Sequence, residues 1–214
     1  MSLPDPPLLL ITDRSQALLP LHEIVRQALE AGCRWLLLRE KDLDSETLAA
    51  FGKPLAKAAR DAGAKFLVSA DVNAAVALKA DGVHLPRRRA FADAVTEVRN
   101  ALGPGALVGV STHNPAEIRE ANELAVDYMT LSPIYPSISK AGYGSGLGAE
   151  TLRQYCALAT KPVIGLGGVT PERLTDALAC GLTGLAVLGA VMQSVEPANE
   201  VAAMVTGMQA AHAG

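Results

Sequence analysis

Residues 163–189, VIGLGGVTPERLTDALACGLTGLAVLG, contain the pattern that decides the fold. Two short apolar runs, Val163–Leu166 and Gly184–Leu188, are each followed by glycine. Continuous apolar runs of this length are typical of strands in a parallel sheet, because helices bury both faces of such a sheet. Between the runs, Thr170-Pro171-Glu172 has the form of a helix start, and the helix is expected to run to Cys180. The segment therefore predicts a strand, a helix and a second strand.

The same strand–helix unit recurs along the whole chain. The predicted strands are Leu8–Thr12, Trp35–Leu38, Lys65–Ser69, Gly82–Leu85, Leu107–Ser111, Tyr128–Leu131, Val163–Leu166 and Gly184–Leu188. The predicted helices are Leu21–Ala31, one that opens near Ser45 with a kink expected at Pro54, Asp71–Lys79, about Ala90–Leu102, Asn114–Leu124, one that ends near Ala159, Thr170–Cys180 and about Val195–Ala210. Eight parallel units in an α/β chain predict a closed (β/α)8 TIM barrel. An open doubly wound sheet is the alternative, which is disfavoured because no glycine-rich turn follows the first strand.

The composition is that of one soluble domain. The chain has 214 residues, 50% apolar and 19% charged, and its 19 Lys and Arg against 22 Asp and Glu give a net charge of −3. No linker or change of composition divides it, so we expect a single barrel domain over residues 1–214. Basic residues gather only at Arg87-Arg88-Arg89. Without a longer basic stripe, nucleic acid is not an expected partner.

Membrane insertion is not expected either. Apolar runs such as Trp35–Leu38 are far shorter than the roughly 18 residues that a membrane span needs, and Met1–Pro7 has no signal-peptide core. We therefore expect a cytoplasmic protein, for which a homo-oligomer remains open. The three cysteines, Cys33, Cys156 and Cys180, have no CxxC spacing and predict neither a disulfide framework nor a zinc site.

Glycines at two neighbouring strand ends predict a phosphate-binding site. Active sites of such barrels lie at the carboxyl ends of the strands, and the loops after the seventh and eighth strands often hold a phosphate on backbone N–H groups. Gly167-Gly168 and Leu188-Gly189 occupy these two places. Glycine permits close backbone approach, and a helix start after each loop would add partial positive charge. The alternative is that the glycines only make tight turns.

Cationic side chains predict a second anion-binding region. Arg39 and Lys41 are two residues apart at the end of the second strand, so their side chains share one side. Lys140 follows Ser137 and Ser139 in the long loop Ser132–Gly148, which we expect to act as a lid. Fixed cations and hydroxyls suit a phosphate or pyrophosphate, whereas solvated surface charge is the alternative for each.

Two histidines lie near the expected strand ends. His84 could face the barrel mouth as a proton carrier, whereas His113 precedes Asn114-Pro115 and is expected to have a helix-capping or packing role. The carboxylates near strand ends are also explained as caps or surface charge, so no metal site is predicted. They are Asp13, Glu40, Asp42 and Asp71.

Taken in order, these motifs resemble the thiamine phosphate synthase and thiazole tautomerase superfamily of (β/α)8 barrels over nearly the whole chain. The resemblance is carried by Ile11-Thr12-Asp13, Leu38–Asp42, Ala80–Leu85, Val108–His113, Asp127-Tyr128, Ser132–Lys140, Pro162–Thr170 and Gly184–Val187.

The resemblance implies a reaction and a set of site residues. In the synthases, hydroxymethylpyrimidine pyrophosphate loses pyrophosphate with magnesium assistance, and thiazole phosphate captures the pyrimidine cation to give thiamine phosphate. The positions that match the pyrophosphate and substrate contacts are Arg39, Lys41, Ser111, Ser137, Ser139 and Lys140. Those that match the thiazole phosphate cradle are Gly167, Gly168, Leu188 and Gly189.

The sequence also departs from the family pattern. The two magnesium-binding aspartates are replaced by Ala70 and Arg89, which leaves magnesium open as a cofactor and makes Arg87 or Arg89 a candidate substitute for its charge. The family's Gln two residues before Arg39 is Leu37. The catalytic histidine of the tautomerase branch aligns with Pro133.

The sequence therefore favours a thiamine phosphate synthase-like transferase that acts on small phosphorylated molecules, with Arg39, Lys41, Ser111, Lys140 and His84 as catalytic candidates. Two alternatives remain within the resemblance: a thiazole tautomerase that uses another acid or base such as His84, and a non-catalytic barrel that binds thiazole phosphate or thiamine phosphate. A different small barrel enzyme for a phosphorylated metabolite is a third.

Overall fold

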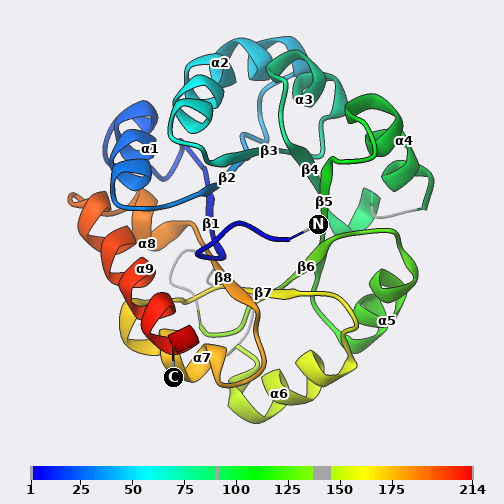
Figure 1. Cartoon of the computed structure of the whole chain (residues 1–214), viewed down its shortest axis with the longest axis vertical. Helices are drawn as coiled ribbons and strands as arrows, with labels where there is room; N and C mark the ends of the chain where they lie inside the picture. The colour runs from blue at the N-terminus through cyan, green and yellow to red at the C-terminus, as the bar shows by residue number, and fades with distance from the viewer. Residues whose placement is uncertain (1, 90–91, 137–145, 214) are drawn as a thin grey trace.

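A computed structural model of the chain describes residues 2–89, 92–136 and 146–213. In these ranges, eight parallel strands close into a barrel in the order of the sequence, and β1 completes the ring by pairing with β8, Leu10 opposite Val187 (Figure 1). The strands are β1 Leu8–Ile11, β2 Trp35–Leu38, β3 Lys65–Ser69, β4 Gly82–Leu85, β5 Leu107–Thr112, β6 Tyr128–Leu131, β7 Val163–Leu166 and β8 Gly184–Val187. The closed ring confirms the predicted (β/α)8 TIM barrel and excludes the open doubly wound sheet.

Helices surround the barrel (Figure 1). They are α1 Leu21–Glu30, α2 Ser45–Asp61, α3 Val72–Leu78, α4 Ala92–Leu102, α5 Pro115–Glu123, α6 Gly148–Leu158, α7 Leu174–Leu178, α8 Gly189–Met192 and α9 Pro197–Ala213, with 3-10 turns η1 Arg87–Arg89 and η2 Pro171–Arg173. Among the described residues, none of these helices has the length and apolar content that crossing a membrane requires.

The helices differ from the prediction in two places, whereas α2 begins at Ser45 as predicted and contains Pro54. The single helix expected from Thr170 to Cys180 is replaced by the η2 turn and the five-residue α7. The four-residue α8 was not predicted, because one helical turn is too short to show a hydrophobic period.

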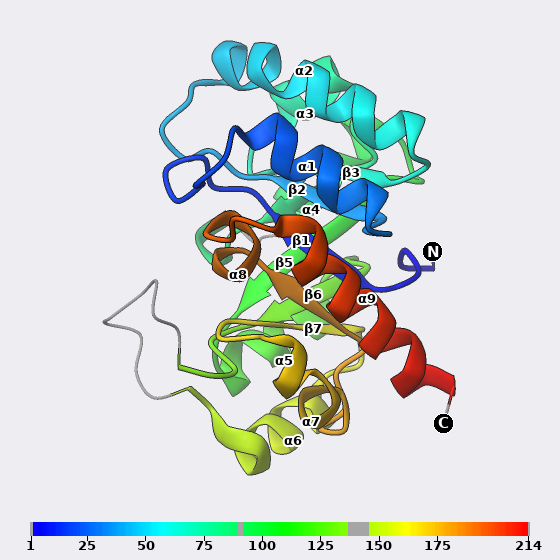
Figure 2. The same cartoon turned by 90° about the vertical axis from the view of Figure 1, so that its left-hand side faces the viewer.

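Two apolar layers hold the barrel together. The outer layer lies between strands and helices, and the inner layer fills the barrel with Leu9, Ile11, Trp35, Leu37, Leu67, Leu107, Tyr128, Ile164 and Ala186. Leu3, ahead of β1, packs against the inner layer. Figure 2 shows both termini at the end of the barrel opposite to the β1–α1 loop, so the chain ends lie away from the carboxyl ends of the strands.

Candidate active site at the barrel mouth

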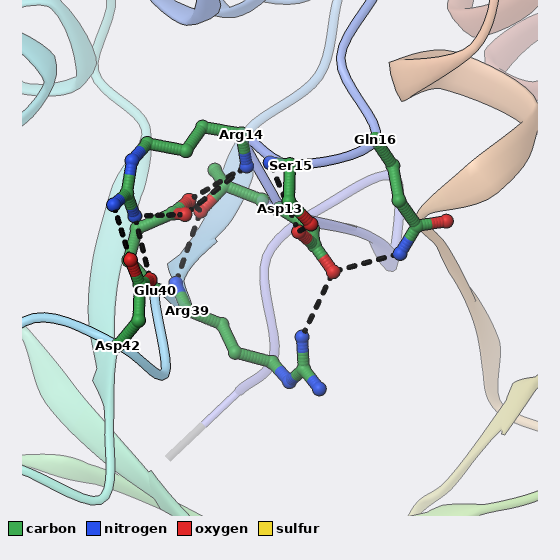
Figure 3. A network of polar contacts seen from close by, with 8 residues as sticks. Asp13, Arg14, Ser15, Gln16, Arg39, Glu40 and Asp42 are labelled. Carbon is green, nitrogen blue, oxygen red and sulfur yellow. Dashed lines mark hydrogen bonds and ion pairs between the residues drawn. The ribbon is translucent and has the colours of Figure 1, made fainter.

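The loops after β1 and β2 are joined through one buried carboxylate (Figure 3). The side chain of Glu40 is only 2% exposed. It accepts hydrogen bonds from Thr12 Oγ1 at 2.8 Å and from the backbone N–H of Arg14 at 3.0 Å. The Arg14 guanidinium donates to it at 3.1 Å, and Thr12 Oγ1 in turn accepts from the backbone N–H of Arg39 at 3.0 Å. Glu40 therefore fixes the backbone from which Arg39 projects.

Arg14 extends this network to the surface. Its Nη1 donates to Asp42 Oδ1 at 2.8 Å, and its guanidinium lies over the Phe51 ring, 5.8 Å from the centroid. The hydrogen bond from Arg14 lowers the pKa of Asp42 below its usual range. Arg14 is thus committed to carboxylates and an aromatic ring, which separates its role from that of Arg39.

Arg39 has a weaker protein partner. Its Nη1 lies 3.5 Å from Asp13 Oδ2, and both side chains are partly exposed. Partial burial raises the pKa of Asp13, but hydrogen bonds from Ser15 and Gln16 and the charge of Arg39 outweigh it, so the net pKa is lowered. Asp13 is therefore an anion that holds Arg39 in place ahead of ligand binding.

Arg39 and Lys41 line one cavity, together with Glu40 between them. The cavity has a volume of about 640 Å³ and lies between the β1–α1 and β2–α2 loops. Its apolar wall is formed by Ala17, Leu19, Pro20, Leu21 and Phe51. Arg14 and three carboxylates, Asp13, Glu40 and Asp42, line it as well, and Arg14 is paired with Glu40 and Asp42. Arg39 and Lys41 beside the apolar wall suit an anionic group attached to an organic ring.

The predicted glycine loop lies at the same mouth, after β7. Gly167 and Gly168 have positive φ angles of 103° and 64°. A Cβ atom on Gly168 would lie 2.5 Å from the carbonyl oxygen of Pro136 and 2.7 Å from Tyr135 Cβ. The glycines are therefore needed for the turn and for the close approach of the segment after β6, which donates from Tyr135 N to Gly167 O at 3.1 Å.

These loops leave backbone donors available. In the part of the chain that the structure describes, no backbone carbonyl accepts from the N–H groups of Gly167, Gly168 or Gly189. The expected help from helix starts is smaller than predicted, since α7 and α8 have only five and four residues and short helices align few peptide dipoles. Leu188 is the N-terminal flanking residue of α8. Anion binding here would rest on individual N–H groups.

His84 lies inside the barrel in a hydrogen-bonded chain. It is 6% exposed, its Nδ1 is 3.0 Å from Tyr128 Oη, and its Nε2 is 3.0 Å from Ser111 Oγ. Burial, with a contribution from the charge of Arg39, lowers the pKa of His84 to about 4. The imidazole is therefore neutral at pH 7, and Ser111, half-buried at the end of β5, is the member nearest the mouth.

His113 has the capping role that the sequence favoured. Its backbone N–H and its Nδ1 both contact Glu117 Oε2, at 2.8 and 2.9 Å. Asn114 caps α5 by accepting from the backbone N–H of Glu117. His113 is thus tied to the start of α5 and is not a candidate proton carrier.

The described carboxylates do not fit the magnesium site that the resemblance implies. Asp71 is the N-cap of α3 and also accepts from Ser45, Asp13 is held by Arg39, and Glu40 and Asp42 are paired with Arg14. Among the described residues, no group of three or more His, Cys, Asp or Glu could hold a metal ion. Ala70, at the position of one family aspartate, has no side-chain oxygen to offer a metal ion.

The structure does not support Arg87 as a substitute for the positive charge of magnesium. Arg87 is bonded to Glu120 and lies 3.8 Å from Glu117, so it is paired with the outer helix α5. The side chain of Arg89 lies outside the described part of the chain, as do Ser137, Ser139 and Lys140 with the centre of the predicted lid.

Sequence reasoning missed two structural residues of the site. Glu40 was assigned to a cap or surface charge, although it is the buried centre of the network in Figure 3. Tyr128 was assigned only to a strand and to a family motif. A signal existed for Tyr128, since a hydroxyl on a buried strand requires a partner, but the sequence did not identify His84 as that partner.

Fold and site together define the class of protein: a (β/α)8 barrel whose cationic and glycine-rich loops gather at the carboxyl ends of the strands. The family model described as thiamine monophosphate synthase matches residues 8–191. The chain belongs to this family, and its role lies in thiamine biosynthesis.

Individual relatives agree with this assignment. The chain is 35% identical over 179 residues to a thiamine-phosphate synthase of Moorella thermoacetica, with 84% of each chain covered. It is 36% identical over 198 residues to a putative thiamine-phosphate synthase of Geobacter sulfurreducens, with 92% of each covered. The solved structure of a thiamine phosphate pyrophosphorylase from Pyrococcus furiosus superimposes with a TM-score of 0.82 at 27% identity, covering 95% of this chain and 96% of the other.

Proposed function

We propose that the protein joins hydroxymethylpyrimidine pyrophosphate to thiazole phosphate and releases pyrophosphate, giving thiamine phosphate. The observation that carries the proposal is that two different sets of groups suited to anions lie at one mouth. Arg39 and Lys41 line a cavity after β1 and β2, and among the described residues no backbone carbonyl accepts from the N–H groups of Gly167, Gly168 and Gly189 after β7 and β8. The reaction needs two such regions, because each substrate carries its own phosphate group.

The two regions take different parts in the reaction. The bond between the pyrimidine methylene carbon and the pyrophosphate oxygen breaks, and its electron pair leaves with pyrophosphate. Arg39 and Lys41 stabilise the negative charge that develops there, because cations held in advance need no reorganisation during the reaction. The glycine loops and Leu188-Gly189 hold the phosphate of the thiazole, whose ring captures the pyrimidine cation.

Ser111 and His84 complete the proposed site, with Ser111 as the member that reaches the ligand. The family resemblance assigns Ser137, Ser139 and Lys140 to the pyrophosphate as well. These three residues lie outside the described part of the chain, so this assignment stays a prediction.

A tautomerase is less well supported. Pro133, at the position of the tautomerase histidine, has no proton to exchange, and His84 is held between Tyr128 and Ser111 inside the barrel. A binding protein without turnover is the remaining alternative, and the same experiment separates all three.

The test is the purified protein supplied with both substrates, with magnesium or with EDTA. We expect thiamine phosphate and pyrophosphate in equal amounts, with only weak dependence on magnesium because the described carboxylates are already paired. Proton exchange on a thiazole carboxylate phosphate without coupling would identify a tautomerase. Saturable binding of thiazole phosphate with no product would identify a binding protein, and a steep magnesium requirement would contradict the assignment of the carboxylates.

A further inference from the structure

A glycine in the middle strand allows three polar side chains to form a chain across the barrel. In the sheet, Gly109 of β5 is paired with His84 of β4 on one side and with Tyr128 of β6 on the other. A Cβ atom on Gly109 would lie 2.1 Å from Tyr128 Cζ and 2.5 Å from its hydroxyl oxygen. The Trp35 ring packs edge-on against Tyr128, with centroids 4.7 Å apart. The position of the phenol beside His84 is therefore built into the core.

The hydrogen positions in the series Tyr128, His84 and Ser111 follow from a count of donors and acceptors. Tyr128 is fully buried, and in the part of the chain that the structure describes His84 Nδ1 is the only hydrogen-bond partner of its hydroxyl. If Nδ1–H donated to the phenol oxygen, the phenol hydrogen would be buried without an acceptor, which is strongly disfavoured. The phenol therefore donates to Nδ1.

The direction of this hydrogen bond fixes the remaining hydrogen positions on His84 and Ser111. A neutral imidazole that accepts at Nδ1 has its hydrogen on Nε2. Nε2–H then donates to Ser111 Oγ over 3.0 Å. Ser111 accepts from inside the barrel, and its own hydroxyl hydrogen remains for a ligand at the mouth. The opposite tautomer would use that hydrogen on His84 and offer the ligand only an acceptor.

We propose that Tyr128 is a positioning residue, which fixes His84 as the Nε2–H tautomer and thereby makes the Ser111 hydroxyl a hydrogen-bond donor toward an anionic or lone-pair-bearing atom of the ligand. The inference rests on the proposed function only in placing a ligand beside Ser111. The tautomer itself is a property of the ligand-free protein.

The first test is NMR of the full chain labelled with ¹⁵N at histidine, without ligand, near pH 7. Long-range nitrogen–proton correlations distinguish the protonated ring nitrogen from the other, and His84→Gln identifies the signal. We expect Nε2–H in the wild type, with Nδ1 at the nitrogen shift of a hydrogen-bonded acceptor. In Tyr128→Phe the Nδ1 shift should move toward that of a free acceptor, because the phenol no longer donates to it. Tyr155→Phe, the same chemical change on α6, should leave the His84 signal unchanged. A wild-type Nδ1–H tautomer overturns the proposal, whether or not Tyr128→Phe folds.

The second test is a double-mutant cycle with inorganic pyrophosphate as the probe, measured by calorimetry. Tyr128→Phe should weaken binding about five-fold, the scale of one neutral hydrogen bond. It should have no effect in the Ser111→Ala background, because Tyr128 acts through Ser111. Equal losses in both backgrounds overturn the proposed route. If wild-type protein does not bind pyrophosphate, the proposed function fails at this site, and the NMR measurement still decides the tautomer.

Discussion

Two parts of the barrel mouth present the groups proposed to bind anions in physically different ways. The charged half, residues 12–14 and 39–42, uses side chains that are held by ion pairs and by the buried Glu40. The glycine half, residues 132–136, 167–168 and 188–189, offers backbone N–H groups, and at Gly168 it leaves no room for a Cβ atom. In the charged half the position of a group depends on electrostatic pairing, whereas in the glycine half it depends on steric fit.

This difference determines which kind of substitution should disrupt each half. Removing a carboxylate from the charged half leaves cations and N–H groups without partners. Adding a single methyl group to the glycine half forces two backbone segments apart.

The largest effect is expected from Glu40→Ala. The variant loses a buried carboxylate that accepts from Thr12 and Arg14, and we expect the free energy of unfolding to fall by about 4 kcal/mol, as for breaking a buried ion pair. Urea denaturation measures this change. The control is Glu30→Ala, which removes an exposed ion pair with Arg26 on α1 and should cost at most about 0.5 kcal/mol. Equal effects of the two variants would mean that Glu40 does not organise the charged half.

A slightly smaller effect is expected from pH, through His84 at the centre of the barrel. Its folded-state pKa of about 4 lies below the usual value of 6.5, so between these values the unfolded chain binds more protons than the folded protein. Stability is then fully present above about pH 6.5 and falls as the pH drops toward 4, by about 3 kcal/mol.

The measurement is urea denaturation at several pH values for the wild type and for His84→Gln, which has no group that titrates there. The difference between the two proteins should show the fall, since titration of all other groups cancels. Parallel curves for the two proteins would contradict a neutral, buried His84.

In the glycine half, Gly168→Ala should lower the free energy of unfolding by about 2 kcal/mol, from backbone strain and from the clash with Pro136 and Tyr135. Gly63→Ala is the matched control, because Gly63 has nearly the same φ, 67°, and no atom within 4 Å of an added Cβ. That control should cost about 1 kcal/mol. Only Gly168→Ala should weaken thiazole phosphate binding, about ten-fold. If the two variants behave alike, close approach is not what the glycine provides.

The sequence predicted the loop conformation of the glycine half better than the contacts of the charged half, for a physical reason. Gly167-Gly168 after an apolar run is a local signal, because glycine is the residue type that permits a positive φ and close backbone approach. The strands and the closed ring were predicted from equally local patterns of apolar residues.

The charged half required three-dimensional information. Glu40, Asp42, Asp13 and Asp71 look alike in the sequence, and only packing determines that Glu40 is buried under Arg14 while Asp71 caps a helix. The hydrogen bond between Tyr128 and His84 likewise joins β6 and β4, which are separated by β5. The periodicity of the sequence does not indicate which side chains meet across an intervening strand.

The smallest effect tests whether a strained backbone conformation also contributes outside the glycine half. Ala70, directly after β3, has a φ of 65°, which glycine adopts freely but which costs a residue with a Cβ atom about 1 kcal/mol. Its N–H donates to His84 O at 3.0 Å, a bond that glycine would keep. Relief of this strain in Ala70→Gly should raise the free energy of unfolding by about 1 kcal/mol. The greater conformational entropy of glycine in the unfolded chain offsets part of this gain, so we expect a small net stabilisation. Thermal and urea denaturation measure the change, with Ala62→Gly, at the end of α2 with negative φ, as the control that should destabilise. If both variants destabilise equally, Ala70 is not strained, and the contrast between a half built on pairing and a half built on backbone conformation becomes sharper.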